Sequence, residues 1–203
     1  MNSPAARFPV SAYDAIVIGG SAGGIEALNV LLPAIPAQMR AAVIIVLHLT
    51  PHSDSILPIL FQEKCAFKTK EADEKETIQS GTVYFAPANY HLLVEEDRTL
   101  SLSVGELVNY SRPSIDVLFE SAALGYGNRL AGIVLTGANQ DGAAGLAAIV
   151  KAGGLGIVQD PESARFPAMP QAALDRVQPC LKMNLAEIAD WLTGHAQDRG
   201  SHG

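Results

Sequence analysis

The chain has 203 residues, 48% of them hydrophobic and 17% charged, which indicates one globular domain with a large core. Its formal net charge of −7 at pH 7 argues against a surface that binds nucleic acids. Its apolar runs all fall short of the roughly 18 residues that a membrane-spanning helix needs, so we expect no direct membrane insertion. The N-terminus lacks the layout of a signal peptide and the only cysteines are Cys65 and Cys180, so we expect a cytoplasmic protein with reduced thiols.

Apolar strands and helices are predicted to alternate along the chain. Residues 1–13 contain two prolines and are predicted to be a flexible lead-in, residues 14–193 a single domain, and residues 194–203 a disordered tail. Continuous apolar runs rich in β-branched residues predict strands buried on both faces at Ala15–Ile18, Ala41–Leu47, Leu130–Leu135 and Leu155–Val158. Apolar residues at helical spacing predict helices at Ile25–Leu32, Ser55–Gln62, 111–125, Ala143–Ala152 and Leu185–Leu192, and a short helix after Pro170.

The shorter extended segments are predicted to lie at the edges of the fold. Phe67–Ala72 is expected to be an edge strand, and Thr82–Ala86, Leu92–Glu95 and Thr99–Ser103 are expected to form a small antiparallel addition. The sequence therefore predicts a three-layer, doubly wound α/β domain, with a mostly parallel sheet, helices on both faces and a small antiparallel hairpin addition.

A glycine-rich turn follows the first predicted strand. Gly19-Gly20-Ser21-Ala22-Gly23 fits the Gly-x-Ser-x-Gly pattern of a nucleophile elbow, in which a serine is exposed between a strand and a helix. A dinucleotide-binding turn requires a glycine where Ser21 stands, and a P-loop requires a lysine that this turn lacks. From this stretch alone, a structural turn whose serine caps the helix remains equally open.

Three polar residues are expected at carboxyl ends of parallel strands, where ligands bind in open α/β sheets. Ser21 follows the first strand, His48 the second, and Asp141 lies in the loop after Leu130–Leu135. Together they form the set required for nucleophilic acyl transfer, although His48 alone could be a packing residue and Asp141 alone a helix cap. A metal site formed by His48, His52 and Asp54 is a weaker alternative because Pro51 interrupts the segment, so we expect no metal ion or cofactor.

Several ordered motifs resemble the catalytic domain of the chemotaxis protein-glutamate methylesterase family, CheB. The resemblance runs from about Ala15 to Leu192 without large gaps. Its motifs are Ile18-Gly-Gly-Ser-Ala-Gly-Gly-Ile-Glu-Ala-Leu28, His48-Leu-Thr-Pro51, Val83-Tyr-Phe-Ala-Pro-Ala-Asn-Tyr-His-Leu92, Arg112-Pro-Ser-Ile-Asp-Val-Leu-Phe119, Leu135-Thr-Gly-Ala-Asn-Gln-Asp-Gly-Ala143 and Gln159-Asp-Pro through Met169-Pro170.

The resemblance implies hydrolysis of methyl esters on glutamate side chains of chemoreceptors or related signalling proteins, with deamidation of glutamine as an additional activity. It implies Ser21 as the nucleophile, His48 as the general base and acid, and Asp141 as the carboxylate that orients the imidazole. The backbone N–H groups of Ala22 and Ala138 would form the oxyanion hole. Phe166 and Met169 are expected to border the substrate groove, and the expected partners are cytoplasmic helices of methylated receptors.

The chain also departs from the family pattern. Ala22 stands where the family commonly has threonine, and Ala138-Asn139 where it has Met-Gly. No receiver domain precedes Ala15, so we expect a stand-alone catalytic domain. These departures keep a second hypothesis open, in which the chain is a non-catalytic adaptor that binds a receptor or kinase. Dinucleotide binding is the weakest of the readings because both Ser21 and His48 misfit it.

Overall fold

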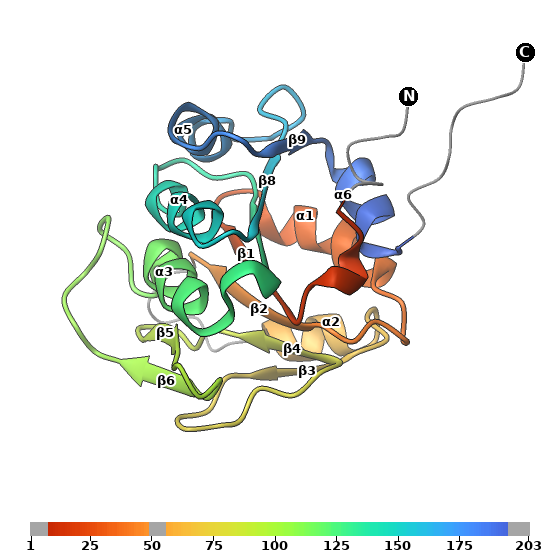
Figure 1. The fold of residues 1–203 in the computed structure, drawn as a ribbon, viewed down its shortest axis with the longest axis vertical. Coiled ribbons are helices and arrows are strands. Elements are labelled where there is room, and N and C mark those ends of the chain that lie inside the picture. Colours follow the sequence, from red (N-terminus) through yellow and green to blue (C-terminus); the bar gives the residue numbers. More distant parts are fainter. Residues whose placement is uncertain (1–7, 49–55, 195–203) are drawn as a thin grey trace, which may run out of the picture.

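The structure, a computed structural model, describes residues 8–48 and 56–194 and contains a seven-stranded parallel sheet. The strand order is β3-β4-β2-β1-β7-β8-β9 (Figure 1). The strands are β1 (Ala15–Gly20), β2 (Ala42–Leu47), β3 (Lys68–Glu71), β4 (Thr82–Phe85), β7 (Leu130–Val134), β8 (Leu155–Gln159) and β9 (Leu181–Met183). Two further strands, β5 (His91–Val94) and β6 (Leu100–Ser103), form a separate antiparallel hairpin.

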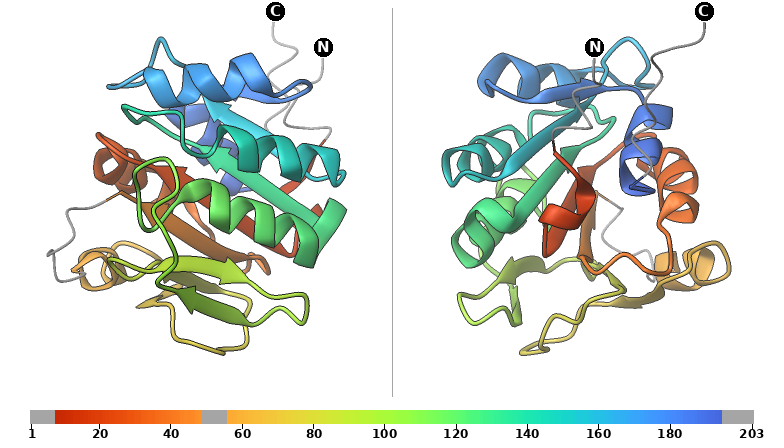
Figure 2. Two further views of the ribbon diagram at one scale, coloured as in Figure 1. Left: turned by 90° about the vertical axis from the view of Figure 1, so that its left-hand side faces the viewer. Right: turned by 45° about the vertical axis from the view of Figure 1, so that its right-hand side comes forward.

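Helices cover both faces of this sheet, as Figures 1 and 2 show. On one face lie α1 (Gly24–Leu31), α2 (Leu57–Gln62) and α6 (Leu185–Leu192), and on the other lie α3 (Ile115–Tyr126), α4 (Ala143–Lys151) and α5 (Ala168–Arg176), with the hairpin packed beside α3. Short 3-10 turns occur at Val10–Ala12, Leu32–Ala34 and Gly127–Arg129.

The central strands are buried on both faces, which explains their continuous apolar runs. Along β1, Ile16 and Ile18 face the core under α1 and α6, whereas Ala15 and Val17 face the core under α3 and α4. The alternation of strand side chains between two cores makes this a three-layer structure. The predicted fold class is therefore confirmed. Among the described residues, no helix has the length and apolar character needed to cross a membrane.

Several predicted element positions were wrong. β4 belongs to the main parallel sheet, between β3 and β2, and not to the antiparallel addition, because Val83 and Tyr84 fill opposite cores. Helix α3 begins after Pro113 and runs to Tyr126 instead of ending at Gly125, and the short strand β9 was not predicted.

The two ends of the chain were predicted to be flexible, and one described segment is packed instead. Val10 and Tyr13 are buried, the Tyr13 ring contacts Trp191 of α6, and Trp191 Nε1 donates a hydrogen bond of 2.7 Å to the Phe8 carbonyl. Residues 8–13 are thus part of the domain. The remaining lead-in, residues 1–7, and the tail from residue 195 lie outside the described residues.

The strand order reverses beside β1. From β1 the chain first extends the sheet through β2 on one side, and later through β7 on the other. The register pairs Gly20 with Leu47 and Gly19 with Val134, so the carboxyl ends of these three strands finish side by side. Such a switch point is where doubly wound sheets bind ligands.

Glycines at this end allow α3 to approach the sheet closely. A Cβ atom added at Gly19 would overlap the Ile115 side chain, and one added at Gly142, whose φ is 95°, would lie 2.8 Å from Ile115 Cγ2. Ile115 is the first residue of α3. Its side chain therefore fits only because both neighbours lack a Cβ, and the N-terminus of α3 is brought against the end of the sheet.

We expect Gly19→Ala to destabilise the domain by about 1–3 kcal/mol, because the added methyl group displaces Ile115 in a packed core. Urea unfolding measures the change in the free energy of unfolding. Gly105→Ala is the control, since its nearest neighbour is the flexible Ser103 hydroxyl at 3.3 Å, and it should alter stability by less than about 0.5 kcal/mol. Equal stability of Gly19→Ala and wild type would contradict the packing argument.

Candidate active site

Ser21 lies at the turn between β1 and α1. Its N–H donates to the Thr136 carbonyl at 3.0 Å, and its own carbonyl accepts from the Gly24 N–H at 2.8 Å. The residue that caps α1 is Gly23, in a left-handed conformation, and no side chain caps this helix. The serine hydroxyl is thus not used as a helix cap, and the side chain is half-buried at the end of the strand.

His48 lies beside Ser21 at the end of the neighbouring strand. The two residues follow the register pair Gly20–Leu47, and the His48 N–H donates to the Gly20 carbonyl at 3.1 Å. The imidazole Nε2 lies 2.8 Å from Asp141 Oδ2. Because an ionised carboxylate only accepts hydrogen bonds, Nε2 carries a proton, and in the neutral form of the ring the lone pair is on Nδ1. His48 makes no hydrogen bond with Ser21 in the described structure, an arrangement common before substrate binds.

Asp141 is completely buried and accepts five hydrogen bonds. Oδ2 accepts from His48 and from the Ile115 N–H at 2.7 Å. Oδ1 accepts from Asn109 Nδ2, Ser114 Oγ and the Asp116 N–H at 2.9, 2.8 and 3.1 Å. Burial alone would raise the pKa of Asp141, but the hydrogen bonds from His48 and the Ile115 N–H hold it below its ordinary value. The carboxylate is therefore ionised and acts on the imidazole as a fixed negative charge.

The sequence also allowed Asp141 to be the cap of α4, the helix that follows it. In the structure Asp141 binds the N-terminus of α3 instead. Gly142 occupies the cap position of α4, and the Asp141 carboxylate instead binds the first N–H groups of α3. Conversely, Asp116 in the first turn of α3 accepts from the Gly142 and Gly145 N–H groups at 3.0 and 2.7 Å. Each carboxylate thus caps the helix that begins beside the other, which satisfies N–H groups that a helix start leaves unpaired.

The backbone N–H groups of Ala22 and Ala138 are the predicted donors of the oxyanion hole. Neither Ala22 N–H nor Ala138 N–H donates to any group in the described part of the chain. The Thr136 hydroxyl joins their two turns, since it donates to the Ala22 carbonyl at 3.0 Å and accepts from the Phe166 N–H at 2.9 Å. The Thr136 N–H is itself held by Gln159 Oε1 at 2.8 Å. These bonds fix the two donors relative to each other, as an oxyanion hole requires.

A groove of about 390 Å³ opens beside Ala138. Phe166, whose side chain is 38% exposed, lines it together with Pro167, Ala168 and Gln171. Met169 does not, because its side chain is fully buried and packs under Gly137, where an added Cβ would lie 2.6 Å from the Met169 sulfur. The expectation that Met169 borders the groove is therefore corrected: it supports the floor of the Ala138 turn.

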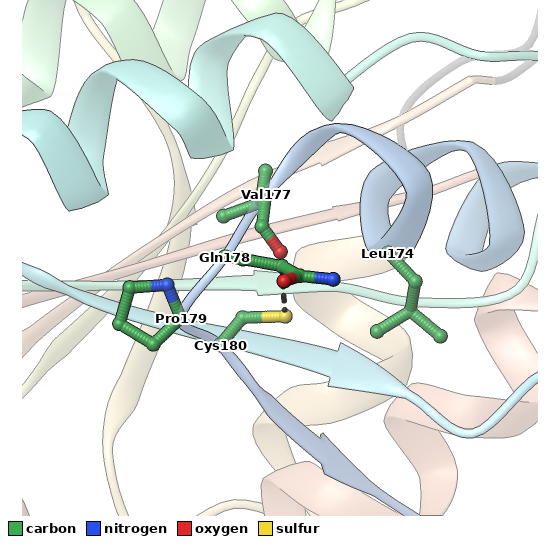
Figure 3. Close-up of a pocket in the computed structure, with 5 residues that line it drawn as sticks. All are labelled: Leu174, Val177, Gln178, Pro179 and Cys180. Carbon is green, nitrogen blue, oxygen red and sulfur yellow. Dashed lines mark hydrogen bonds between the residues drawn. The ribbon is translucent and has the colours of Figure 1, made fainter.

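A larger hollow, of about 600 Å³, lies away from these residues (Figure 3). It is lined by Leu174 of α5 and by the segment 177–180 between α5 and β9, where Cys180 Sγ donates to the Val177 carbonyl at 3.3 Å. This segment precedes β9 and so lies at the amino ends of the parallel strands, opposite to Ser21. None of the predicted site residues lines it.

The sequence singled out Ser21, His48 and Asp141, and the structure brings their three strand ends together. It did not single out Asn109, Ser114, Thr136 and Gln159, which hold that arrangement. Ser114 carried a usable signal, because a serine just before an apolar helical stripe is a typical cap. Within the described residues no group of three metal-ligating side chains gathers. His52 and Asp54, the alternative metal ligands, lie outside the described residues.

Comparisons with known proteins agree on one family. The family model described as CheB methylesterase matches residues 16–192. A Leptospira interrogans protein is 50% identical over 178 residues, which cover 88% of this chain and 92% of that protein. Protein-glutamate methylesterase/protein-glutamine glutaminase 2 of Methanosarcina mazei is 37% identical, over 91% of this chain and 52% of that protein. The crystal structure of the Thermotoga maritima CheB methylesterase catalytic domain superposes with a TM-score of 0.84 at 26% identity, covering 89% of this chain and 97% of that chain.

The lowered pKa of Asp141 predicts how Asp141→Asn responds to pH. A depressed folded-state pKa gives stability that is present above the ordinary value of 3.8 and is lost as pH falls through the lower folded value. Asp141→Asn should therefore be less stable than wild type at neutral pH. The difference should narrow as the pH falls below 3.8 and through the lower folded-state value, because a protonated Asp141 resembles asparagine.

Urea unfolding at several pH values measures this difference. Asp175→Asn is the control, because among the described residues Asp175 is bonded only to Gln171, on the surface of α5. A gap between Asp141→Asn and wild type that stays constant with pH would show that the lost stability does not come from the carboxylate charge.

Proposed function

Because this chain belongs to the CheB methylesterase family, we propose that it is a serine hydrolase that removes methyl esters from glutamate side chains of chemoreceptors or related signalling proteins. Deamidation of glutamine side chains at the same site belongs to the proposal, since the Methanosarcina mazei relative is named for both activities. The observation that carries it is the His48–Asp141 hydrogen bond of 2.8 Å at the strand end beside Ser21. The family relationship supports an enzyme over the adaptor reading.

The reaction begins at the Ser21 hydroxyl. Ser21 Oγ attacks the ester carbonyl carbon and its proton passes to His48 Nδ1, the ring nitrogen left free by the bond to Asp141. Negative charge develops on the carbonyl oxygen, where the N–H groups of Ala22 and Ala138 receive it. One such donor typically contributes about 3–4 kcal/mol in the transition state. The tetrahedral intermediate collapses, the bond to the methoxy oxygen breaks, and His48 gives that oxygen its proton, so methanol leaves.

Water completes the cycle. It attacks the acyl-enzyme, an ester between Ser21 and the glutamyl group, while His48 Nδ1 takes its proton. Collapse of the second intermediate returns the proton to Ser21 Oγ and releases the glutamate carboxylate. For a glutamine substrate the first leaving group is ammonia. Throughout, Asp141 stays ionised and stabilises the imidazolium without taking its proton.

The substrate would be a receptor helix in the cytoplasm, with its side chain inserted toward Ser21. The chain carries a net charge of −7, so long-range attraction to an acidic receptor helix does not drive docking. Local contacts have to do so, and the groove beside Ala138 offers an apolar wall through Phe166 and Pro167.

Ser21→Ala should abolish methanol release from a methylated receptor cytoplasmic fragment, because it removes the hydroxyl that forms the acyl-enzyme. The residual rate should be at least about 10³-fold below wild type. Gas chromatography of methanol measures the rate, and a thermal melt checks the fold. Glutamine deamidation, read as ammonia release, should disappear together with methanol release. Turnover that survives in a folded Ser21→Ala protein would exclude the serine mechanism.

Phe166→Ala should separate binding from chemistry. Loss of the exposed ring from the groove should raise KM by about 3- to 10-fold and leave kcat within about twofold, since the ring lies beside the reacting atoms and not among them. Met169→Ala is the matched variant, and it should lower stability by about 2–5 kcal/mol because it empties a buried site. A fall in kcat with unchanged KM for Phe166→Ala would assign the ring a different role.

A further inference from the structure

Asn109 connects two carboxylates, Asp141 of the candidate triad Ser21–His48–Asp141 and the neighbouring Asp116. Its single amide nitrogen is 2.9 Å from Asp141 Oδ1 and 2.8 Å from Asp116 Oδ2. An amide NH₂ group has two hydrogens, so each carboxylate receives one. Asn109 is neutral, and it therefore links the two negative groups without adding a charge.

The second carboxylate acts on the same segment of chain. Asp116 is buried, and its other oxygen accepts from the N–H of Gly142, the residue directly after Asp141. Burial raises the pKa of Asp116, and the charge of Asp141 raises it further, while the Gly145 N–H acts in the opposite direction. Two carboxylates this close repel each other unless donors lie between them. Asn109 is the side chain that supplies a donor to both.

The backbone at Asn109 is shaped for this contact. Its φ is 51° and that of Tyr110 is 61°, in the left-handed region that asparagine tolerates better than most residues. Arg112 holds the loop on its far side through the carbonyls of Val104 and Gly105 at 2.8 and 2.7 Å. The amide is thus presented to Asp141 by a loop with its own fixed geometry.

We propose that Asn109 is a positioning residue of this enzyme: its amide fixes the Asp141 carboxylate and ties it to Asp116, so that His48 is held with Nδ1 toward Ser21. The proposal rests on the proposed function and concerns a residue outside the triad. Oδ1 of Asp141 receives all three of its donors from residues 109–116, and Asn109 is the one that reaches it from the loop before α3.

Other titratable groups lie around Asn109, Asp116 and Asp141, and they contribute to the dependence of activity on pH. His48 faces Asp141 from the end of β2, and Asp116 faces it from α3. Glu120, one turn further along α3, feels both carboxylates as well as Arg176 at the end of α5. His91 of β5 is also near, and its Nδ1 accepts from the Ser114 N–H at 3.1 Å while Nε2 donates to the Glu106 carbonyl at 2.8 Å.

Three variants test the role of the amide. Asn109→Gly removes the amide and can still adopt the positive φ. It should lower kcat about 10- to 100-fold and leave KM within about twofold, because it removes a hydrogen bond to a charged group. Asn109→Asp places a third carboxylate against Asp141. It should lower kcat further, and its activity should begin to fall at a higher pH on the acid side than that of wild type.

The double variant N109D/D116N separates positioning from structure. It again pairs an amide with a carboxylate at positions 109 and 116, but the amide that donates is now at position 116. The amide oxygen introduced at position 116 still accepts from Gly142 and Gly145, and its amide nitrogen can donate to the carboxylate introduced at position 109, so the melting temperature should rise above that of Asn109→Asp. No donor then faces Asp141 from position 109, so kcat should stay low. Recovery of kcat together with stability would overturn the proposal, as would an unchanged kcat in Asn109→Gly.

A spectroscopic readout keeps this test independent of the assigned substrate. The His48 Nε2 proton bonded to Asp141 should give a far-downfield proton NMR signal in wild type, shifted or broadened in Asn109→Gly. Absence of turnover in wild type would remove the proposed function while this signal still tests the positioning role. Lys75→Gly is the control, because Lys75 is also at positive φ (60°) but is exposed in the loop between β3 and β4, and it should leave both signal and kcat unchanged.

Discussion

The structure depends on a carboxylate that is withdrawn from water where a strand, two helices and a loop meet. Desolvating such a charge costs several kcal/mol, and the cost is offset only when its oxygens are fully hydrogen-bonded. Asp141 meets that condition through donors from the end of β2, the start of α3 and the loop before it. Every element that supplies a donor is thereby fixed relative to the others. The same bonds that make the buried charge tolerable also define the direction of the imidazole.

Close packing makes these donors reachable. Ile115 sits between Gly19 of β1 and Gly142 at the start of α4, and a Cβ on either glycine would exclude it. Further along, a Cβ at Gly145 would lie 2.5 Å from Phe119 Cβ, so α3 and α4 pack in direct contact. The N-terminus of α3 can therefore point at Asp141, where its unpaired N–H groups and its dipole favour negative charge.

The sequence could predict features that depend on neighbouring residues, and it could not predict contacts that depend on how distant elements pack. The runs around Ile16 and Ile44 identified central strands, because burial on both faces leaves a continuous apolar signature. β4 was misplaced because four residues cannot show which sheet they join. Asp141 could be singled out because it follows a predicted strand, whereas the helix that it binds depends on how α3 packs, which the sequence does not encode locally. No sequence pattern marks Asn109, because its contact with Asp141 depends on the conformation of the loop before α3.

The short connection from β7 to α4 carries two parts of the site at once. Ala138 N–H and the Asp141 carboxylate are three residues apart, and Thr136, at its start, is bonded to both the Ala22 and Phe166 turns. An insertion or deletion in this segment would displace the proposed oxyanion donor, Ala138 N–H, and the carboxylate bonded to His48 together. The side chains of Phe166 and Gln171 line the groove and donate no hydrogen bond to Asp141, so a change of substrate preference is expected to arise at these side chains rather than in the connection itself.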